Sequence, residues 1–240
     1  YSNPMTPNNI AFPIRINTHM AHMGMSTRRG ADVLVSQGKV FINGKRVVLG
    51  TMVQKGDHVE LKNAIKKEYV YVLWYKPRDV ATPDAKTLEI GGQNIKTHAI
   101  GRLDKETDGL LLLSNDTRLS ERLLNPKYNH EKEYEVSVRE SIVPAQIKQL
   151  LAGVKVAHEG KKVLVKAKNA LKAEPHILHM VLTEGKKHQV RQMCAAVHLT
   201  VDHLRRIRIQ NLTLKKLHPN QTRVLSPEEV SELLTSVGLM

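Results

Sequence analysis

The sequence predicts an α+β protein in which a small α/β domain precedes a larger domain built on a mostly antiparallel mixed sheet. Expected strands outnumber helices and rarely alternate with them. The composition is that of a globular protein, with 41% hydrophobic and 25% charged residues. A short polar bridge separates two basic blocks. We therefore expect a flexible lead-in over residues 1–13, a first domain over 14–62, a linker over 63–68 and a second domain over 69–240.

The first block has clear local signals for helix and hairpin. Thr27 is expected to cap a helix that ends near Gly38, because a hydroxyl can accept a free backbone N–H there. Residues 40–48 contain the pair Asn43-Gly44, the strongest short hairpin signal, since both residues tolerate positive φ. A further strand is expected over residues 58–61.

The second block contains more strands than helices. Alternating or fully apolar runs predict strands over 69–75, 110–113, 134–139 and 176–183. Apolar spacing and capping signals predict helices over 144–151 and 188–197, and a last helix after the capping box at Ser226. Residues 81–95 are expected to form a loop.

The charge balance points to a polyanionic partner. The net charge is +14, with 37 basic and 23 acidic residues. The longest strictly apolar run is Leu110 to Leu113, far short of a membrane span, so no membrane association is expected. The only cysteine, Cys194, lies on the apolar face of an expected helix and reads as a core residue. A chain without a disulfide fits the reducing cytoplasm or an organellar matrix.

Common cofactor and metal motifs are missing from the sequence. The twelve histidines are not accompanied by CxxC or HExxH, and no phosphate-binding glycine loop is present. We therefore expect neither a metal nor a cofactor. The informative segment is instead residues 99–116, where Gly101 and Gly109 bracket a dense polar loop that leads into the apolar strand. Rigid flanks of this kind position catalytic groups.

Gly101-Arg102-Leu103-Asp104 and the residues that follow closely resemble the central motif of the pseudouridine synthases, best in the RsuA branch that acts on ribosomal RNA. Further motifs of that family match in order at 75–77, 131–134, 184–193 and 204–209. The sequence at residues 129–134, 192–194 and 208–211 is most similar to that of RluF-type enzymes, which act on the large-subunit (23S) RNA. The first block resembles an S4 RNA-binding domain.

The resemblance implies isomerisation of a specific uridine to pseudouridine, without a cofactor, on a base that is flipped out of its stack. Asp104 matches the essential aspartate, which acts on the ribose either by attack at C1′ or by proton removal to give a glycal; both routes stay open. Arg191 matches the arginine that pairs with this carboxylate. Tyr134 matches the tyrosine that stacks on the target base.

The resemblance also implies substrate contacts. Lys76 would support the catalytic loop, Arg102 would fill the space left by the flipped base, and Leu204 would form an apolar wall of the pocket. Arg206 is counted with these substrate-binding residues. Six residues of the S4-like block would contact phosphates and set register: Arg15, Arg28, Arg29, Lys39, Lys45 and Arg46.

Two rival functions use the same residues. A non-catalytic S4-domain RNA-binding or ribosome-assembly factor would keep the fold without needing Asp104, Tyr134 and Arg191 together. Hydrolysis of a glycosidic bond by Asp104 and Asp108 would release free uracil. The expected partner is ribosomal RNA, as a fragment or an assembly intermediate, and transfer RNA is left open as a second substrate. The enzyme is expected to be a monomer. His188 and Gln192 replace usual arginines of the family, which leaves the target uridine open.

Overall fold

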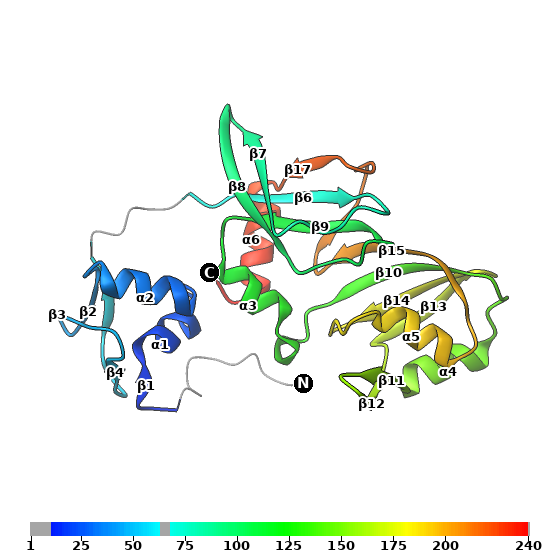
Figure 1. The fold of residues 1–240 in the computed structure, drawn as a ribbon, viewed down its shortest axis with the longest axis horizontal. Coiled ribbons are helices and arrows are strands. Elements are labelled where there is room, and N and C mark those ends of the chain that lie inside the picture. The colour runs from blue at the N-terminus through cyan, green and yellow to red at the C-terminus, as the bar shows by residue number, and fades with distance from the viewer. Residues whose placement is uncertain (1–10, 63–67, 240) are drawn as a thin grey trace. The chain divides into compact units, whose positions relative to one another are not determined.

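The computed structural model describes residues 11–62 and 68–239. The chain divides into two compact units between Tyr69 and Val70, and each unit is described by itself (Figure 1).

The first unit packs two helices against short strands. Its described elements are β1 (Ile14–Arg15), α1 (Ile16–His22), α2 (Arg28–Ser36), β2 (Val40–Ile42), β3 (Lys45–Arg46), β4 (Met52–Val53) and β5 (Val59–Leu61). The predicted cap is confirmed, since Thr27 Oγ1 accepts from the Gly30 amide at 3.0 Å. The predicted hairpin is also confirmed: Phe41 pairs with Arg46 across Asn43 and Gly44, whose φ angles are 49° and 77°.

Helix α1 was not predicted, although it supplies much of the core of this unit. Ile16 and Met20 are buried against Ala31 and Val35 of α2 and Val40 of β2. The helix is only seven residues long and follows a proline-rich lead-in, so its apolar period was too short to read.

The second unit is organised around one ten-stranded sheet. Seven strands form its main path in the order β13 (Asn169–Glu174), β14 (Ile177–Leu182), β10 (Lys132–Val138), β15 (Val201–Ile209), β9 (Asp108–Ser114), β6 (Tyr71–Lys76) and β17 (Thr222–Val224). The other three are β7 (Ala85–Ile90), β8 (Gln93–Ile100) and β16 (Leu212–Thr213). The remaining elements are α3 (Arg118–Leu124), η2 (Pro126–Tyr128), α4 (Pro144–Ala152), β11 (Val154–His158), β12 (Lys161–Val165), α5 (Gln189–Ala196) and α6 (Pro227–Ser236).

The predicted mostly antiparallel sheet is confirmed, with one parallel contact at its centre. Strands β9 and β15 run parallel and pair only through Asp108 with Arg205 and Gly109 with Arg206. Gly109 has φ +109°, and a Cβ built on it would lie 2.3 Å from the Arg206 carbonyl oxygen. Glycine is therefore required where the two backbones approach. This short contact joins two halves of the sheet.

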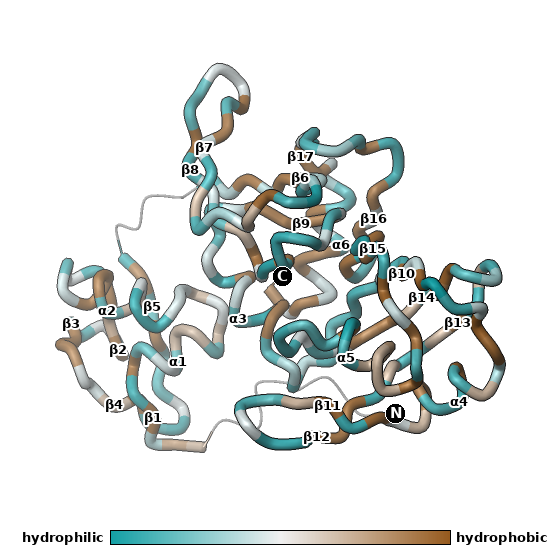
Figure 2. Tube along the Cα trace, turned by 45° about the vertical axis from the view of Figure 1, so that its right-hand side comes forward, coloured by the Kyte–Doolittle hydropathy of each residue, from teal (hydrophilic) through white to brown (hydrophobic). Residues whose placement is uncertain are grey.

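Each half of the sheet has its own apolar core. One core lies around β10, β14, α4 and α5 and includes Val136, Leu178 and the predicted core residue Cys194, whose thiol pKa is raised to about 12 by burial. The other lies around β6, β9, α3 and α6 and includes Leu110 and Leu233. Figure 2 shows the hydrophobic stretches along β6 and β9. The predicted strand at 110–113 and helix at 144–151 are thus confirmed as parts of β9 and α4.

The prediction of a loop over residues 81–95 was wrong. Strands β7 and β8 form a hairpin there, and β8 continues the sheet beside β9 through the pair Ile100 and Leu112. The turn uses Gly91 and Gly92, whose φ angles are +58° and +76°. That pair is a hairpin signal of the same kind as Asn43-Gly44, so the sequence did contain the information. No helix among the described residues is long and apolar enough to cross a membrane.

Candidate active site

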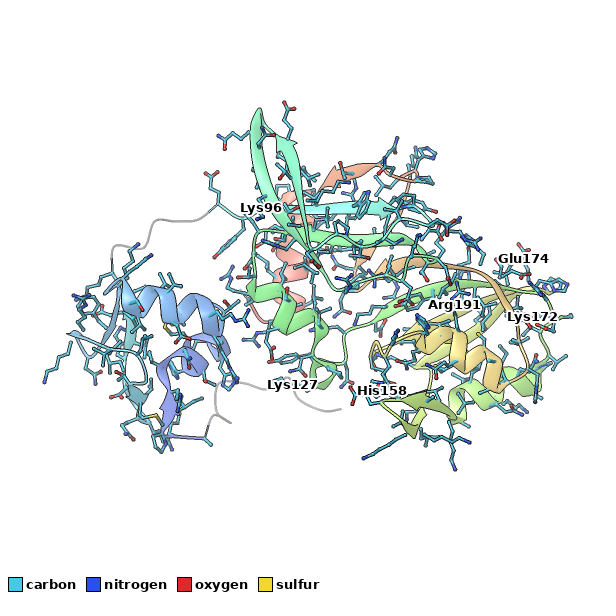
Figure 3. All side chains as sticks on the ribbon, in the orientation of Figure 1. Lys96, Lys127, His158, Lys172, Glu174 and Arg191 are labelled. Carbon is cyan, nitrogen blue, oxygen red and sulfur yellow. The ribbon has the colours of Figure 1, made fainter. Side chains whose placement is uncertain are left out.

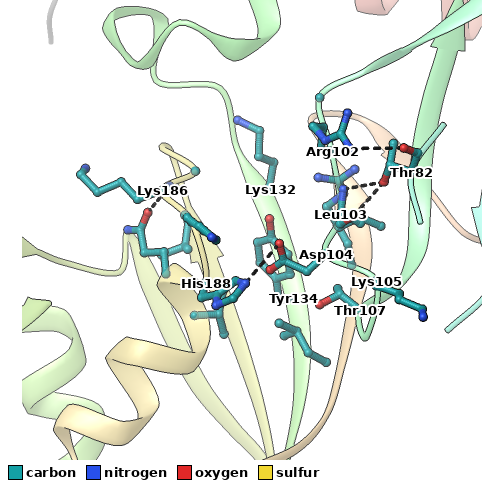
Figure 4. A pocket seen from close by; sticks show the side chains of 18 of the residues that line it. Thr82, Arg102, Leu103, Asp104, Lys105, Thr107, Lys132, Tyr134, Lys186 and His188 are labelled. Atoms are coloured by element: carbon teal, nitrogen blue, oxygen red, sulfur yellow. Dashed lines mark hydrogen bonds and ion pairs between the residues drawn. The ribbon is translucent and has the colours of Figure 1, made fainter. Parts of the chain in front are cut away.

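A cleft of about 690 Å³ opens in the second unit beside the junction of the two half-sheets (Figure 4). Its walls are the loop 101–107, residues 185–190 at the start of α5, and side chains of β10 and β15. The cleft brings together five of the predicted site residues: Arg102, Asp104, Tyr134, Leu204 and Arg206. Lys76 and Arg191 do not line it.

Lys76 supports the loop that carries Asp104 without lining the cleft. Its side chain is fully buried, and its Nζ donates to the carbonyl oxygens of Pro77 at 2.9 Å, Val80 at 2.6 Å and Lys105 at 3.3 Å. Burial lowers the pKa of Lys76, and the nearby carboxylates of Asp108, Asp79 and Asp104 oppose that effect. The Lys105 carbonyl, directly after Asp104, is thereby fixed.

Thr82 holds the same loop on the other side of Asp104. The Thr82 hydroxyl donates to the Leu103 carbonyl at 2.8 Å and accepts from the Leu103 amide at 3.1 Å. The side chain is 4% exposed. Arg102 is anchored nearby, through the Thr82 carbonyl at 3.3 Å and Asp84 Oδ1 at 3.0 Å. Sequence reasoning missed Thr82 because it fell in the segment that we expected to be a loop.

Asp104 faces His188, and the expected ion pair with Arg191 is absent from the described part of the chain. His188 Nε2 lies 3.6 Å from Asp104 Oδ1 (Figure 4). Arg191, which is labelled in Figure 3, instead donates from Nη1 to the Val201 carbonyl at 3.4 Å, at the entry to β15. The physical reason is position: His188 directly precedes α5 and lines the cleft, whereas Arg191 is the third residue of the helix and does not line the cleft. The sequence offered His188 only as a departure from the family pattern.

Tyr134 and Leu204 belong to the apolar part of the cleft, together with Leu103, Leu124, Leu182 and Val190. Both side chains are nearly buried, at 8% and 4% exposure, and they project from the neighbouring strands β10 and β15. The tyrosine ring therefore offers a face to a planar base, and the leucine limits the space around it. The roles that the resemblance implies for these two residues stay a prediction.

Two buried cations complete the floor of the cleft. Lys132 and Arg206 are 7% and 3% exposed, and both line the cleft. Arg206 Nε donates to the Leu110 carbonyl at 2.8 Å, but its buried Nη2 has no hydrogen-bond partner among the described residues. Lys132 Nζ reaches only the carbonyls of His130 and Leu123, at 3.4 and 3.5 Å. Burial, with Arg206 nearby, lowers the pKa of Lys132 to about 8.

Asp108 does not share the site with Asp104. It accepts from Tyr75 Oη at 2.7 Å and Arg205 Nε at 3.2 Å, and its other oxygen lies 2.8 Å from His203 Nε2. Successive strand residues point to opposite faces, so Arg205 and His203 lie on the face away from Leu204 and the cleft. Burial and the bond to Asp108 raise the pKa of Tyr75 to about 12. A hydrolase that uses Asp104 and Asp108 together is therefore not supported.

The charge of the cleft suits an anionic ligand. Its lining contains a single carboxylate, Asp104, together with six cationic side chains: Arg102, Lys105, Lys132, Lys186, Lys187 and Arg206. Among the residues that the structure describes, no group of three or more His, Cys, Asp or Glu side chains could hold a metal ion. In the first unit Lys39 is half-buried, and five of the predicted phosphate contacts are exposed: Arg15, Arg28, Arg29, Lys45 and Arg46.

Comparison with known families identifies both units. Residues 70–196 match the RNA pseudouridylate synthase family, and residues 14–59 match the S4 domain. A solved structure described as a pseudouridylate synthase shares the fold, with a TM-score of 0.64 at 24% identity, and the match covers 92% of this chain and 99% of that one.

Full-length relatives agree with these matches. Ribosomal large subunit pseudouridine synthase B of Bacillus subtilis is 37% identical over 234 residues, which cover 91% of this chain and 95% of that protein. The dual-specificity RNA pseudouridine synthase RluF of Escherichia coli is 31% identical over 231 residues, which cover 92% of this chain and 78% of that protein. The predicted resemblance is confirmed.

Proposed function

The chain belongs to the RNA pseudouridylate synthase family and isomerises uridine in RNA; on that premise we propose that its substrate is ribosomal RNA, and in particular that of the large subunit. The observation that carries the proposal is the placement of Asp104 at the mouth of a cationic cleft that also contains the ring of Tyr134. The name of the Bacillus subtilis relative supports large-subunit ribosomal RNA, and the name of RluF supports an RNA substrate.

We propose that Asp104 acts on the ribose of a flipped uridine while its base lies against Tyr134. The N1–C1′ bond breaks, the uracil turns, and a C5–C1′ bond forms. The C5 proton leaves and N1 gains a proton, so no atom is gained and no electron is transferred. Asp104 can reach this result by attack at C1′ or by removal of a ribose proton to give a glycal.

The proposed supporting roles follow from the contacts. Lys76 ties the catalytic loop, at the Lys105 carbonyl, to the carbonyls of Pro77 and Val80. Leu204 forms an apolar wall, and Arg102 lies at the cleft, where it could fill the space of the flipped base. Arg191 stays a candidate partner of Asp104 in the RNA complex. Its Nη1 donates to the Val201 carbonyl, and its buried Nε has no hydrogen-bond partner among the described residues, so a donor remains for the carboxylate.

We propose that the S4 unit adds phosphate contacts through its exposed basic residues, which raise affinity without choosing the base. The proposed enzyme is a monomer of the cytoplasm, with residues 14–62 as the RNA-binding domain and 69–240 as the catalytic domain. Transfer RNA is a second candidate substrate, because the relative RluF is named a dual-specificity enzyme.

The test is tritium release from RNA labelled at uridine C5, followed by separation of the product nucleosides. Wild type is compared with Asp104→Asn, and Glu89→Gln is the control because that carboxylate is exposed on β7 and lies outside the cleft. We expect release and pseudouridine from wild type and the control on ribosomal RNA, with loss in Asp104→Asn. Release on transfer RNA alone would contradict the proposed substrate, and free uracil would indicate hydrolysis.

A further inference from the structure

Lys132 is a buried cation in the cleft without a counter-ion. Its side chain is 7% exposed and lines the cleft together with Tyr134, which lies two residues further along the same face of β10. Among the described residues its ammonium group contacts two backbone carbonyls at 3.4 and 3.5 Å and no carboxylate. Arg206, the other buried cation, also keeps a free donor, Nη2. A buried charge without a counter-ion and an unsatisfied buried donor are both costly, so Lys132 and Arg206 together call for an anionic ligand.

The reaction itself creates a suitable ligand. When the N1–C1′ bond breaks, its electron pair stays with the uracil, and the negative charge spreads over N1, O2 and O4. This charge is absent from the bound uridine and appears only as the bond breaks. A fixed cation in a water-poor site stabilises such a developing charge more than it stabilises the neutral substrate, and so accelerates the step.

We propose that Lys132 is a catalytic residue of this reaction, and that its ammonium group, beside the guanidinium of Arg206, stabilises the uracil anion released from C1′. The inference rests on the proposed function. It holds for both routes of Asp104, because attack at C1′ and glycal formation expel the same uracil anion. Return of the pair to the sugar through C5, followed by proton loss from C5 and protonation of N1, completes a balanced isomerisation.

A contact to phosphate is the competing role for Lys132, and the burial argues against it. The cations available to a polyanion at the mouth of the cleft are more accessible: Lys105 and Lys187 are exposed and Lys186 is half-buried beside Glu184. Lys132 instead lies with the residues that face the base, Tyr134 and Leu204. A phosphate contact would change RNA affinity, whereas anion stabilisation changes the rate of bond cleavage.

The test is the single-turnover rate of uridine loss in ribosomal RNA, measured together with the RNA dissociation constant. The variants are Lys132→Met, which keeps the length of the side chain, and Lys132→Arg, which keeps the charge. Lys187→Met is the control, an exposed lysine of the same cleft. Each enzyme is also assayed on RNA made with 5-fluorouridine, whose electron-withdrawing fluorine makes N1 a better leaving group.

We expect Lys132→Met to lose about 100-fold in rate on uridine RNA, as for removal of one oxyanion donor, with a dissociation constant within about twofold of wild type. The loss should shrink to about tenfold or less on 5-fluorouridine RNA, and Lys132→Arg should recover part of the rate. Equal losses on both RNAs, or a change confined to RNA affinity, would overturn the proposal. For each variant the rates on the two RNAs are compared within one enzyme preparation. Partial misfolding lowers both rates equally, so it cannot change their ratio. Inactive wild type would refute the proposed substrate instead.

Discussion

The hydroxyl of Thr82 bridges the backbone of Leu103, donating to its carbonyl at 2.8 Å and accepting from its amide at 3.1 Å. Leu103 lies between Arg102 and Asp104, so this one side chain fixes the residue between two proposed functional groups. On the other side of Asp104, Lys76 Nζ donates a hydrogen bond to the carbonyl of Lys105. The Asp104 carboxylate is therefore positioned by clamps before and after it in the chain.

Replacement of Thr82 should separate positioning from binding. Thr82→Val keeps the shape but leaves the amide and carbonyl of Leu103 without their partner, a loss of about 1–3 kcal/mol. We expect kcat to fall about tenfold with KM within about twofold, because a displaced carboxylate reacts slowly without weakening RNA contacts. Thr82→Ser, which retains the hydroxyl, should restore most of kcat. A rise in KM at unchanged kcat would show that Thr82 contacts RNA instead.

Replacement of Gly109 should destabilise the junction of the two half-sheets. In Gly109→Ala the new Cβ would lie 2.3 Å from the Arg206 carbonyl oxygen, and φ is +109°, so the strands must separate. We expect a loss of about 2–4 kcal/mol in the free energy of unfolding by urea titration. Gly160→Ala is the control: its φ is +75° but no atom lies within 4 Å, so about 1 kcal/mol is expected. Equal losses in both variants would mean that the close approach is unimportant.

The pH dependence should report the ionisation of Lys132. Burial, with Arg206 of β15 nearby, lowers its pKa to about 8. Two other titratable groups lie near Lys132. His130 directly precedes β10, and burial, followed by the charges of Lys132 and Arg122, lowers its pKa. Asp104 lines the same cleft as Lys132. We expect kcat to be present below pH 8 and to fall as the pH rises through it, and Lys132→Arg to lack that fall. If kcat of Lys132→Arg falls with rising pH in the same way as that of wild type, the fall is due to another group.

The lowered pKa of Lys132 affects folding stability in the opposite direction from activity. The folded-state pKa is lower than the unfolded value of 10.5, so between about pH 8 and 10.5 the unfolded chain binds more protons. Lys132 should therefore add stability as the pH rises through this window, while activity declines. Urea titrations of wild type and Lys132→Met measure the difference in stability, which should change with pH across the window and stay constant above it.

The S4 unit should contribute salt-dependent affinity and leave the chemical step unchanged. Arg28 and Arg29 lie exposed in the first turn of α2. If both contact phosphates, their replacement by alanine should reduce the slope of log affinity against log salt by about 1.4, since each single-strand contact adds about 0.7. The rate at saturating RNA should stay the same. Lys148→Ala, an exposed lysine of α4, is the control; an equal change there would point to a general charge effect.

Local features of the fold could be predicted because neighbouring residues decide them. The Thr27 cap, the Asn43-Gly44 turn and the capping box at Ser226 all have the geometry expected from their sequence. The four apolar residues Leu110 to Leu113 are fully buried, as their pattern indicated. Helix α3 and the β7–β8 hairpin were missed, although Gly91-Gly92 marked the hairpin turn.

The sequence by itself determined the family, the residue types of the site and most regular elements, because motifs and caps depend on residues within a few positions. Tertiary structure alone decided which side chains meet. Asp108 lies only four residues after Asp104 yet points to the other face of the sheet, and His188, not Arg191, faces Asp104. Strand pairing across about 100 residues, as between Gly109 and Arg206, sets these relationships. Local pattern cannot encode them, because the alternation of a strand fixes a face only once its partners are known.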